Sequence, residues 1–138
     1  MLVDSDRRDC RQFLAELEDL KTHCDPCPPT LFRLAIEETE AWLLGDPGAL
    51  ERVFPNLKRP VVKKYVQDSV CGTWEVLADA IHDGGVANLK ERGARAVGSA
   101  KSQWVAAMSE RMDIAKNRSP SFQAFVRGLH RLTAPGHD

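Results

Sequence analysis

Apolar residues recur at spacings of three and four in several segments of the chain, which is the pattern of amphipathic helices. The clearest such segments are residues 7–22, 73–81, 94–115 and 120–132. The last one has a serine directly before a proline at its start, which is a strong N-terminal capping signal. The pattern therefore predicts a helix-rich protein.

Two segments predict β-strands instead. The chain opens with the apolar run Met1-Leu2-Val3, and the second strand is expected over Arg33–Ile36. Residues 58–72 fit either a helix or a strand, and we expect a loop over residues 86–89. Because a helix separates the two strands, the expected fold is α/β, with a small and mostly parallel sheet flanked by helices.

The second strand runs directly into a helix-forming segment. Glu37, Glu38 and Glu40 fall in the first turn expected for this helix, and Gly45 suits the left-handed position just past its end. Asp46-Pro47 then predicts the cap and first residue of another short helix, which reaches about residue 53. The glutamates thus follow the carboxyl end of a strand, the edge of α/β sheets where ligands gather.

Length and composition favour one soluble domain. The chain has 138 residues, of which 43% are hydrophobic and 28% charged. We expect a single domain over residues 1–133 and a disordered tail over residues 134–138. No apolar run is long enough for a membrane span and no signal-peptide pattern opens the chain, so we expect a cytoplasmic protein with no membrane partner.

The net charge of −1 conceals a marked asymmetry. Residues 1–51 have a charge balance of −7, whereas residues 86–132 have a balance of +6. One interpretation is an acidic metal site beside a basic surface for phosphates. The other is that the two halves attract each other in the fold.

Asp4 and Asp6 form a D-x-D pair at the end of the first strand. Residues two apart in an extended segment point to the same side, so the pair would present both carboxylates together. Such a pair suits a hard divalent cation such as Mg²⁺, which prefers oxygen ligands. Alternatively, Asp6 only caps the following helix and Asp4 is solvated.

The three glutamates also have two interpretations. Negative charge is favourable in the first turn of any helix. In the functional interpretation, one of them completes an acidic metal cluster with the D-x-D pair. Glu37 and Glu40 would share a helical face and Glu38 would point elsewhere, so at most two of the glutamates converge.

Candidate binding sites for phosphate or nucleic acid lie late in the chain. Arg118, Ser119 and Ser121 surround the N-terminus of the last helix, where free amides and a basic side chain would meet a phosphate, although capping explains Ser119 equally well. A wider set of basic residues indicates either a nucleic-acid surface or a solvated helical face. This set comprises Lys90, Arg92, Arg95, Lys101, Arg111, Lys116, Arg118, Arg127 and Arg131.

Three segments together resemble a known family. They are residues 2–10 (LVDSDRRDC), 33–47 (RLAIEETEAWLLGDP) and 117–125 (NRSPSFQAF). They resemble the bacterial domain-of-unknown-function 4276 family, whose members look like Toprim-type proteins and are similar to the nuclease half of overcoming-lysogenization-defect systems. The resemblance covers nearly the whole chain, and its middle segment is the most specific.

The resemblance implies a compact Toprim-like domain that binds Mg²⁺ or Mn²⁺ and acts on phosphodiester bonds. In some relatives such a domain works beside an ATPase of the AAA or ABC type in phage defence. The residues it implies for catalysis are Asp4, Asp6, Glu38 and Glu40. The metal ligands it implies are Asp4, Asp6, Glu38 and Asp46.

The chain departs from the Toprim pattern at its beginning. A Toprim domain starts with a strand that ends in a glutamate, whereas this sequence starts at the D-x-D strand. We therefore expect an impaired or inactive nuclease domain with an unpaired sheet edge, which invites a homodimer or a partner. The alternative is a non-catalytic interaction or regulatory subunit that binds a partner ATPase or nucleic acid.

Overall fold

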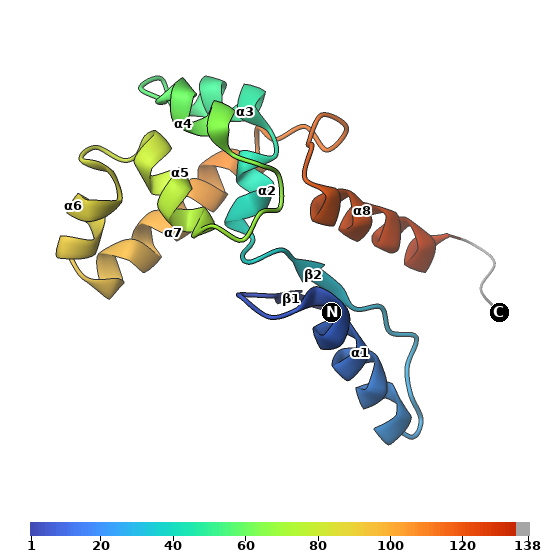
Figure 1. The fold of residues 1–138 in the computed structure, drawn as a ribbon. Helices are drawn as coiled ribbons and strands as arrows, with labels where there is room; N and C mark the ends of the chain where they lie inside the picture. The colour runs from blue at the N-terminus through green and yellow to red at the C-terminus, as the bar shows by residue number, and fades with distance from the viewer. Residues whose placement is uncertain (135–138) are drawn as a thin grey trace.

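The computed structural model describes residues 1–134 of the chain (Figure 1). The tail predicted over residues 134–138 lies, apart from Ala134, outside these described residues. The strands are β1 (Leu2–Asp4) and β2 (Arg33–Ala35). The helices are α1 (Cys10–Asp19), the short 3-10 helix η1 (Leu20–His23), α2 (Glu40–Leu44), α3 (Pro47–Val53), α4 (Arg59–Lys64), α5 (Thr73–Ile81), α6 (Gly85–Glu91), α7 (Ala94–Ser109) and α8 (Pro120–Thr133). None of the described helices is long and apolar enough to cross a membrane.

The two strands form a parallel pair, as the sequence predicted. Leu2 lies opposite Arg33 and Asp4 lies opposite Ala35. The connection between the strands runs through α1, which makes a β-α-β unit (Figure 1). The helix-rich α/β class is confirmed, and the likeness to Toprim domains stays a prediction.

Helices cover both sides of β2. Leu34 and the adjacent Phe32 pack with Leu17 of α1 in one apolar cluster. Ala35 belongs to a second cluster, with Trp42 of α2 and Phe122 of α8. Because side chains alternate along a strand, β2 can bury residues against helices on both of its faces.

The largest core lies away from the strands, among α2 to α7 (Figure 1). Its fully buried members include Leu44, Leu50, Leu77 and Met108. The helical part therefore has its own apolar interior, and α2 links it to the strands through Trp42, which packs edge-on against Phe122 at 5.2 Å between ring centres.

Several predicted elements are confirmed: α3 reaches Val53, α5 spans the predicted residues 73–81, and α8 begins at Pro120. The loop predicted over residues 86–89 is wrong, because these residues lie in α6. The third long helix ends at Ser109, before the predicted residue 115. Residues 59–64 of the ambiguous segment form a helix.

The prediction for Gly45 is also wrong. Its φ of −67° is helical and not left-handed. A Cβ at this position would lie 2.1 Å from Oδ1 of Asn117, so glycine is required by close packing. Asn117 in turn donates from Nδ2 to the carbonyl oxygen of Trp42 at 2.7 Å, which gives a second donor to a carbonyl that also accepts from the Gly45 amide at the end of α2.

Candidate functional site

The carboxyl ends of β1 and β2 are held together beyond the strands themselves. The Ser5 amide donates to the Ala35 carbonyl and the Asp6 amide donates to the Glu37 carbonyl, both at 2.9 Å. The buried Ser5 hydroxyl accepts a hydrogen bond from the Glu37 amide at 2.8 Å. These contacts bring the D-x-D segment beside the glutamate segment, as the strand order predicted.

Lys101 of α7 lies between two of the glutamates. Its Nζ is 3.2 Å from Oε2 of Glu38 and 3.1 Å from Oε1 of Glu40. Glu40 is only 3% exposed, and Lys101 and Glu38 are half-buried. Both pairs are therefore more shielded from solvent than ordinary surface ion pairs.

Asp4 faces the same group of charges. Partial burial raises the pKa of its carboxyl, and the carboxylates of Glu40 and Asp6 raise it further, while Lys101 acts in the opposite direction. Asp6 has a left-handed φ of 48° and lines a hollow of about 350 Å³ together with Glu37 and Glu38. We call Asp4, Asp6, Glu38, Glu40 and Lys101 the acidic site.

The acidic site has more negative than positive charge. Burial raises the pKa of Glu38, and the neighbouring Glu40 raises it further, although Lys101 opposes both. Burial by itself lowers the pKa of Lys101, but the carboxylates of Glu40 and Glu38 outweigh it and the pKa is raised. The single ammonium group pairs with two of the four carboxylates, and the surplus negative charge is the electrostatic condition that attracts a cation.

The predicted arrangement of the glutamates is wrong. Glu38 and Glu40 share a partner, and Glu37 points elsewhere. The buried Glu37 carboxylate accepts hydrogen bonds from the amides of Thr73 at 2.7 Å and Gly72 at 3.0 Å, and from the Thr73 hydroxyl. The cause is that α2 begins only at Glu40, so helical spacing does not apply to the residues before it.

Glu37 therefore caps the N-terminus of α5. Burial by itself raises the pKa of its carboxyl, but the hydrogen bonds from Thr73, Gly72 and Cys71 outweigh burial and the pKa is lowered. This carboxylate is saturated by donors of the protein itself.

The alternative in which Asp6 caps the first helix is wrong. Asp9, and not Asp6, caps α1, with Oδ1 accepting from the Gln12 amide at 2.8 Å. Asp6 is exposed at the strand end, so its carboxylate is free of the capping role.

Asp46 lies at the other end of α2 from Glu40. Its Oδ1 accepts from the Ala49 amide and its Oδ2 accepts from the Asp113 amide, both at 2.9 Å. The capping prediction for Asp46 is confirmed. The structure does not bring this predicted metal ligand into the acidic site.

The predicted phosphate site at the start of α8 holds a carboxylate of the chain. The Ser119 hydroxyl donates to Oδ1 of Asp68 at 2.7 Å, and the Ser121 amide donates to Oδ2 at 2.6 Å. Ser119 and Ser121 are buried, whereas Arg118 is exposed. Asp68 thus takes the anion position at this helix N-terminus, and the serines serve the fold.

The acidic site has the ligand atoms that a metal ion needs, but these atoms are not arranged to hold one. Carboxylate oxygens are what Mg²⁺ and Mn²⁺ prefer. Within residues 1–134, however, no group of three or more His, Cys, Asp or Glu side chains is arranged to hold a metal ion. In the acidic site, the Lys101 ammonium group occupies the space between Glu38 and Glu40.

Sequence reasoning missed Lys101 and Ser5 as parts of this site. In the sequence Lys101 belongs to the set of basic residues of a possible surface, because nothing in the local pattern separates it from them. Its position on the inner side of α7, close to the buried Ala100 and Trp104, was the available signal. Ser5 gave no signal, since it lies between two more conspicuous aspartates.

Comparison with known protein families identifies this chain. The family model described as "Domain of unknown function (DUF4276)" matches residues 1–130. No curated protein and no solved structure matches the chain. Because the family model covers nearly the whole sequence, the chain belongs to the DUF4276 family.

Proposed function

We propose that the acidic site is the remnant of a metal-dependent site that acts on phosphodiester bonds, in a nuclease-type domain of bacterial phage defence. The observation that carries this proposal is the gathering of Asp4, Asp6, Glu38 and Glu40 at the carboxyl ends of two parallel strands. The resemblance to Toprim-type proteins supports the same reaction class. A cytoplasmic location and a partner ATPase of the AAA or ABC type belong to this proposal.

The site as it stands lacks an arrangement that would hold the cation. Lys101 supplies positive charge to Glu38 and Glu40 in its place, and the Asp4 carboxyl stays close to that pair. We therefore expect the isolated chain to bind Mg²⁺ or Mn²⁺ weakly, in competition with Lys101, and to be impaired in cleavage.

Calorimetric titration with Mn²⁺ tests this proposal. Asp4→Asn should weaken Mn²⁺ binding by about tenfold or more, because one carboxylate ligand is lost. Lys101→Met should strengthen it, because the competing ammonium group is removed and the surplus negative charge grows. Glu110→Gln changes the same charge as Asp4→Asn at an exposed position outside the site and should have no effect.

The absence of saturable Mn²⁺ binding in both the unaltered chain and Lys101→Met would sink the proposal. Equal effects of Asp4→Asn and Glu110→Gln would also contradict it, because binding would then reflect net charge alone.

A second candidate function is a non-catalytic interaction subunit that binds a partner ATPase, nucleic acid or a second copy of the chain. Within the described residues, β1 pairs only with β2, so its other edge is open. The neighbouring Met1 is 68% exposed, and an apolar hollow of about 300 Å³ lies between α1, β2 and α8. Open edges and apolar surfaces favour association. This function predicts no saturable Mn²⁺ binding in the same titration.

A further inference from the structure

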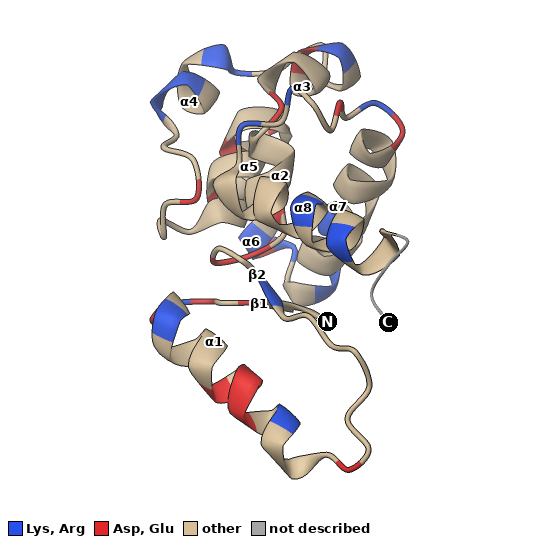
Figure 2. Cartoon of the chain, turned by 90° about the vertical axis from the view of Figure 1, so that its right-hand side faces the viewer, with Lys and Arg blue, Asp and Glu red and all other residues tan. Residues whose placement is uncertain are grey.

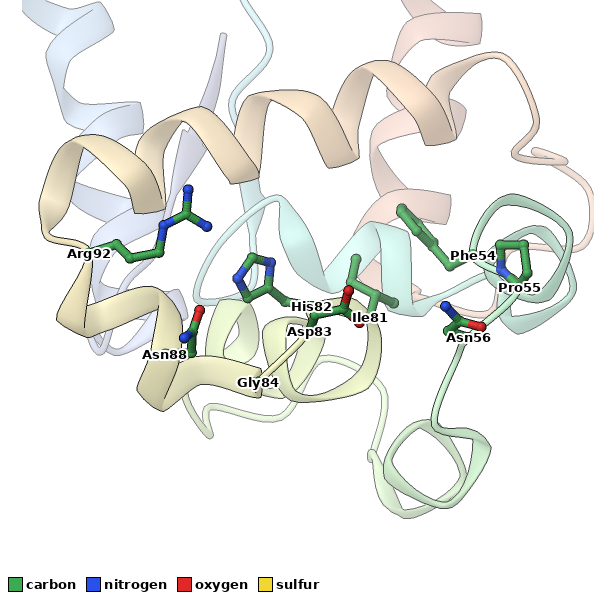
Figure 3. Close-up of a pocket in the computed structure, with 9 residues that line it drawn as sticks. All are labelled: Phe54, Pro55, Asn56, Ile81, His82, Asp83, Gly84, Asn88 and Arg92. Carbon is green, nitrogen blue, oxygen red and sulfur yellow. The ribbon is translucent and has the colours of Figure 1, made fainter.

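Two adjoining hollows lie on the helical part of the molecule, away from the strand ends. The first has a volume of about 650 Å³ and lies between residues 54–56 and residues 81–84 (Figure 3). The second has a volume of about 390 Å³ and follows the first turns of α7. His82 and Arg92 line both hollows, so we treat them as one feature, the arginine cleft. Each of the two hollows has the size of a small-molecule site, which measures roughly 300–1,000 Å³.

The chemistry of the arginine cleft changes from one end to the other. Phe54 and Pro55 lie at one end of the first hollow and Arg92 lies at the other, with His82 between them (Figure 3). Arg95 adds a second guanidinium group in the adjoining hollow. Asp83 contributes one carboxylate to the lining of the first hollow. A ligand with an anionic end and a flat apolar end would match this gradient.

The cationic end of the cleft coincides with the start of α7. This helix has 16 residues, and its N-cap residue, Gly93, provides no side-chain cap. Its first turn has no acidic residue, and it is flanked by Arg92 and includes Arg95. In the part of the chain that the structure describes, neither arginine forms a salt bridge. Positive charge from two arginines and a helix N-terminus is thus left without an anion.

His82 provides an independent sign of a missing partner. The residue is half-buried and lines both hollows, and its Nε2 is closed to solvent and has no hydrogen-bond partner among residues 1–134. Buried polar atoms in folded proteins nearly always have such a partner. A turn of the half-buried ring toward the hollows would let this nitrogen meet a polar atom of a ligand.

We propose that the arginine cleft binds a small phosphate-bearing ligand of the mononucleotide type. Arg92, Arg95 and the first amides of α7 bind the phosphate. Phe54 and Ile81 contact the flat base, and Asn56 and Asn88 provide polar groups for its edge. The assignment is independent of the acidic site, which lies on another face of α7 around Lys101.

Calorimetric titration of the full chain with adenosine monophosphate tests the assignment. Adenosine monophosphate should bind saturably, and inorganic phosphate and adenosine should each bind at least about tenfold more weakly, because each fills one end only. Arg92→Gln and Arg95→Gln should each weaken binding at least about tenfold, the usual effect of losing a charge-assisted hydrogen bond. Arg127→Gln, an exposed arginine of α8, should leave binding unchanged.

A pair of serine variants separates occupation of the cleft from general effects of charge. Ser99 and Ser102 are both exposed on α7, but only Ser99 lines the cleft. Ser99→Phe should block adenosine monophosphate, and Ser102→Phe should not. Asp4→Asn should leave this binding intact, so failure here and failure at the acidic site are distinguishable.

Each of the following results would overturn the assignment: no saturable binding of adenosine monophosphate, equal weakening by Arg92→Gln and Arg127→Gln, or inorganic phosphate binding as tightly as the nucleotide. A short oligonucleotide with a terminal phosphate that binds more tightly than adenosine monophosphate, with the same sensitivity to Arg92→Gln, would assign the cleft to a nucleic-acid end and overturn the small-ligand proposal.

Discussion

Glu37 and Glu38 are neighbours in the sequence, but their carboxylates have different partners. Glu37 adopts a left-handed φ of 61° and caps α5, whereas Glu38 pairs with Lys101 of α7. Because of this backbone turn, one glutamate stabilises the helical part and the next belongs to the acidic site. Removing the charge of the capping Glu37 should therefore lower the stability of the fold, whereas removing a charge from the acidic site should raise it.

Glu37→Gln should lower the free energy of unfolding by about 1.5–3 kcal/mol at neutral pH, because a charged acceptor of several hydrogen bonds is lost. The pKa of Glu37 is lowered, so its ionised form stabilises the folded state above its ordinary value of 4.5. That contribution is lost as the pH falls through the folded pKa. Urea unfolding at pH 7 and at lower pH measures it, with Glu110→Gln as control. Equal stability of the two variants at pH 7 would contradict the capping role.

Asp4→Asn should raise the melting temperature at neutral pH. The pKa of Asp4 is raised, so its ionised form destabilises the folded state above its ordinary value of 3.8. This cost disappears as the pH falls below that value, so the advantage of the variant should disappear too. Thermal denaturation at pH 7 and in acid would show this difference, with Asp25→Asn in an exposed loop as the control. A lower melting temperature at pH 7 would show that Asp4 has a structural role.

At the scale of elements, α8 depends on a carboxylate from outside the helix. Asp68 accepts hydrogen bonds from Ser119 and Ser121 and lies in the loop before α5, with a left-handed φ of 57°. Asn tolerates this conformation, so Asp68→Asn removes the charge and preserves the backbone.

Asp68→Asn should destabilise the start of α8 by about 1–3 kcal/mol, because a charge-assisted acceptor is removed. Hydrogen exchange should become faster at the α8 amides and stay unchanged in α1, which does not contact Asp68. Unchanged exchange throughout α8 would refute this account of how the helix is held.

Local signals predicted those elements whose boundaries depend on neighbouring residues alone. Ser119-Pro120 predicted the start of α8, and Asp46 predicted the start of α3. The wrong predictions lie where the conformation depends on contacts that the local pattern does not show. The loop expected over residues 86–89 is instead α6, into which Gly84 and Gly85 lead with positive φ values of 80° and 67°. Gly45 suggested a left-handed turn, but it accommodates Asn117, which is distant in the sequence.

At the scale of the molecule, the charge asymmetry of the sequence corresponds to particular parts of the fold. Acidic residues lie on α1, alongside basic ones, and near the strand ends, whereas α8, from the basic half of the sequence, is basic (Figure 2). Lys101 comes from the basic half and binds Glu38 and Glu40 of the acidic half. The sequence could therefore predict the carboxylates of the site but not its lysine, because that contact spans 63 residues.

The account depends centrally on the acidic site being where a divalent cation binds, and paramagnetic broadening by Mn²⁺ would locate such an ion directly. On gradual addition of Mn²⁺, the amide signals of Asp4, Ser5, Glu38 and Lys101 should broaden first in nuclear magnetic resonance spectra. The effect should be reduced in Asp4→Asn and enhanced in Lys101→Met. Broadening that begins elsewhere, or that affects exposed carboxylates throughout the chain equally, would contradict the claim.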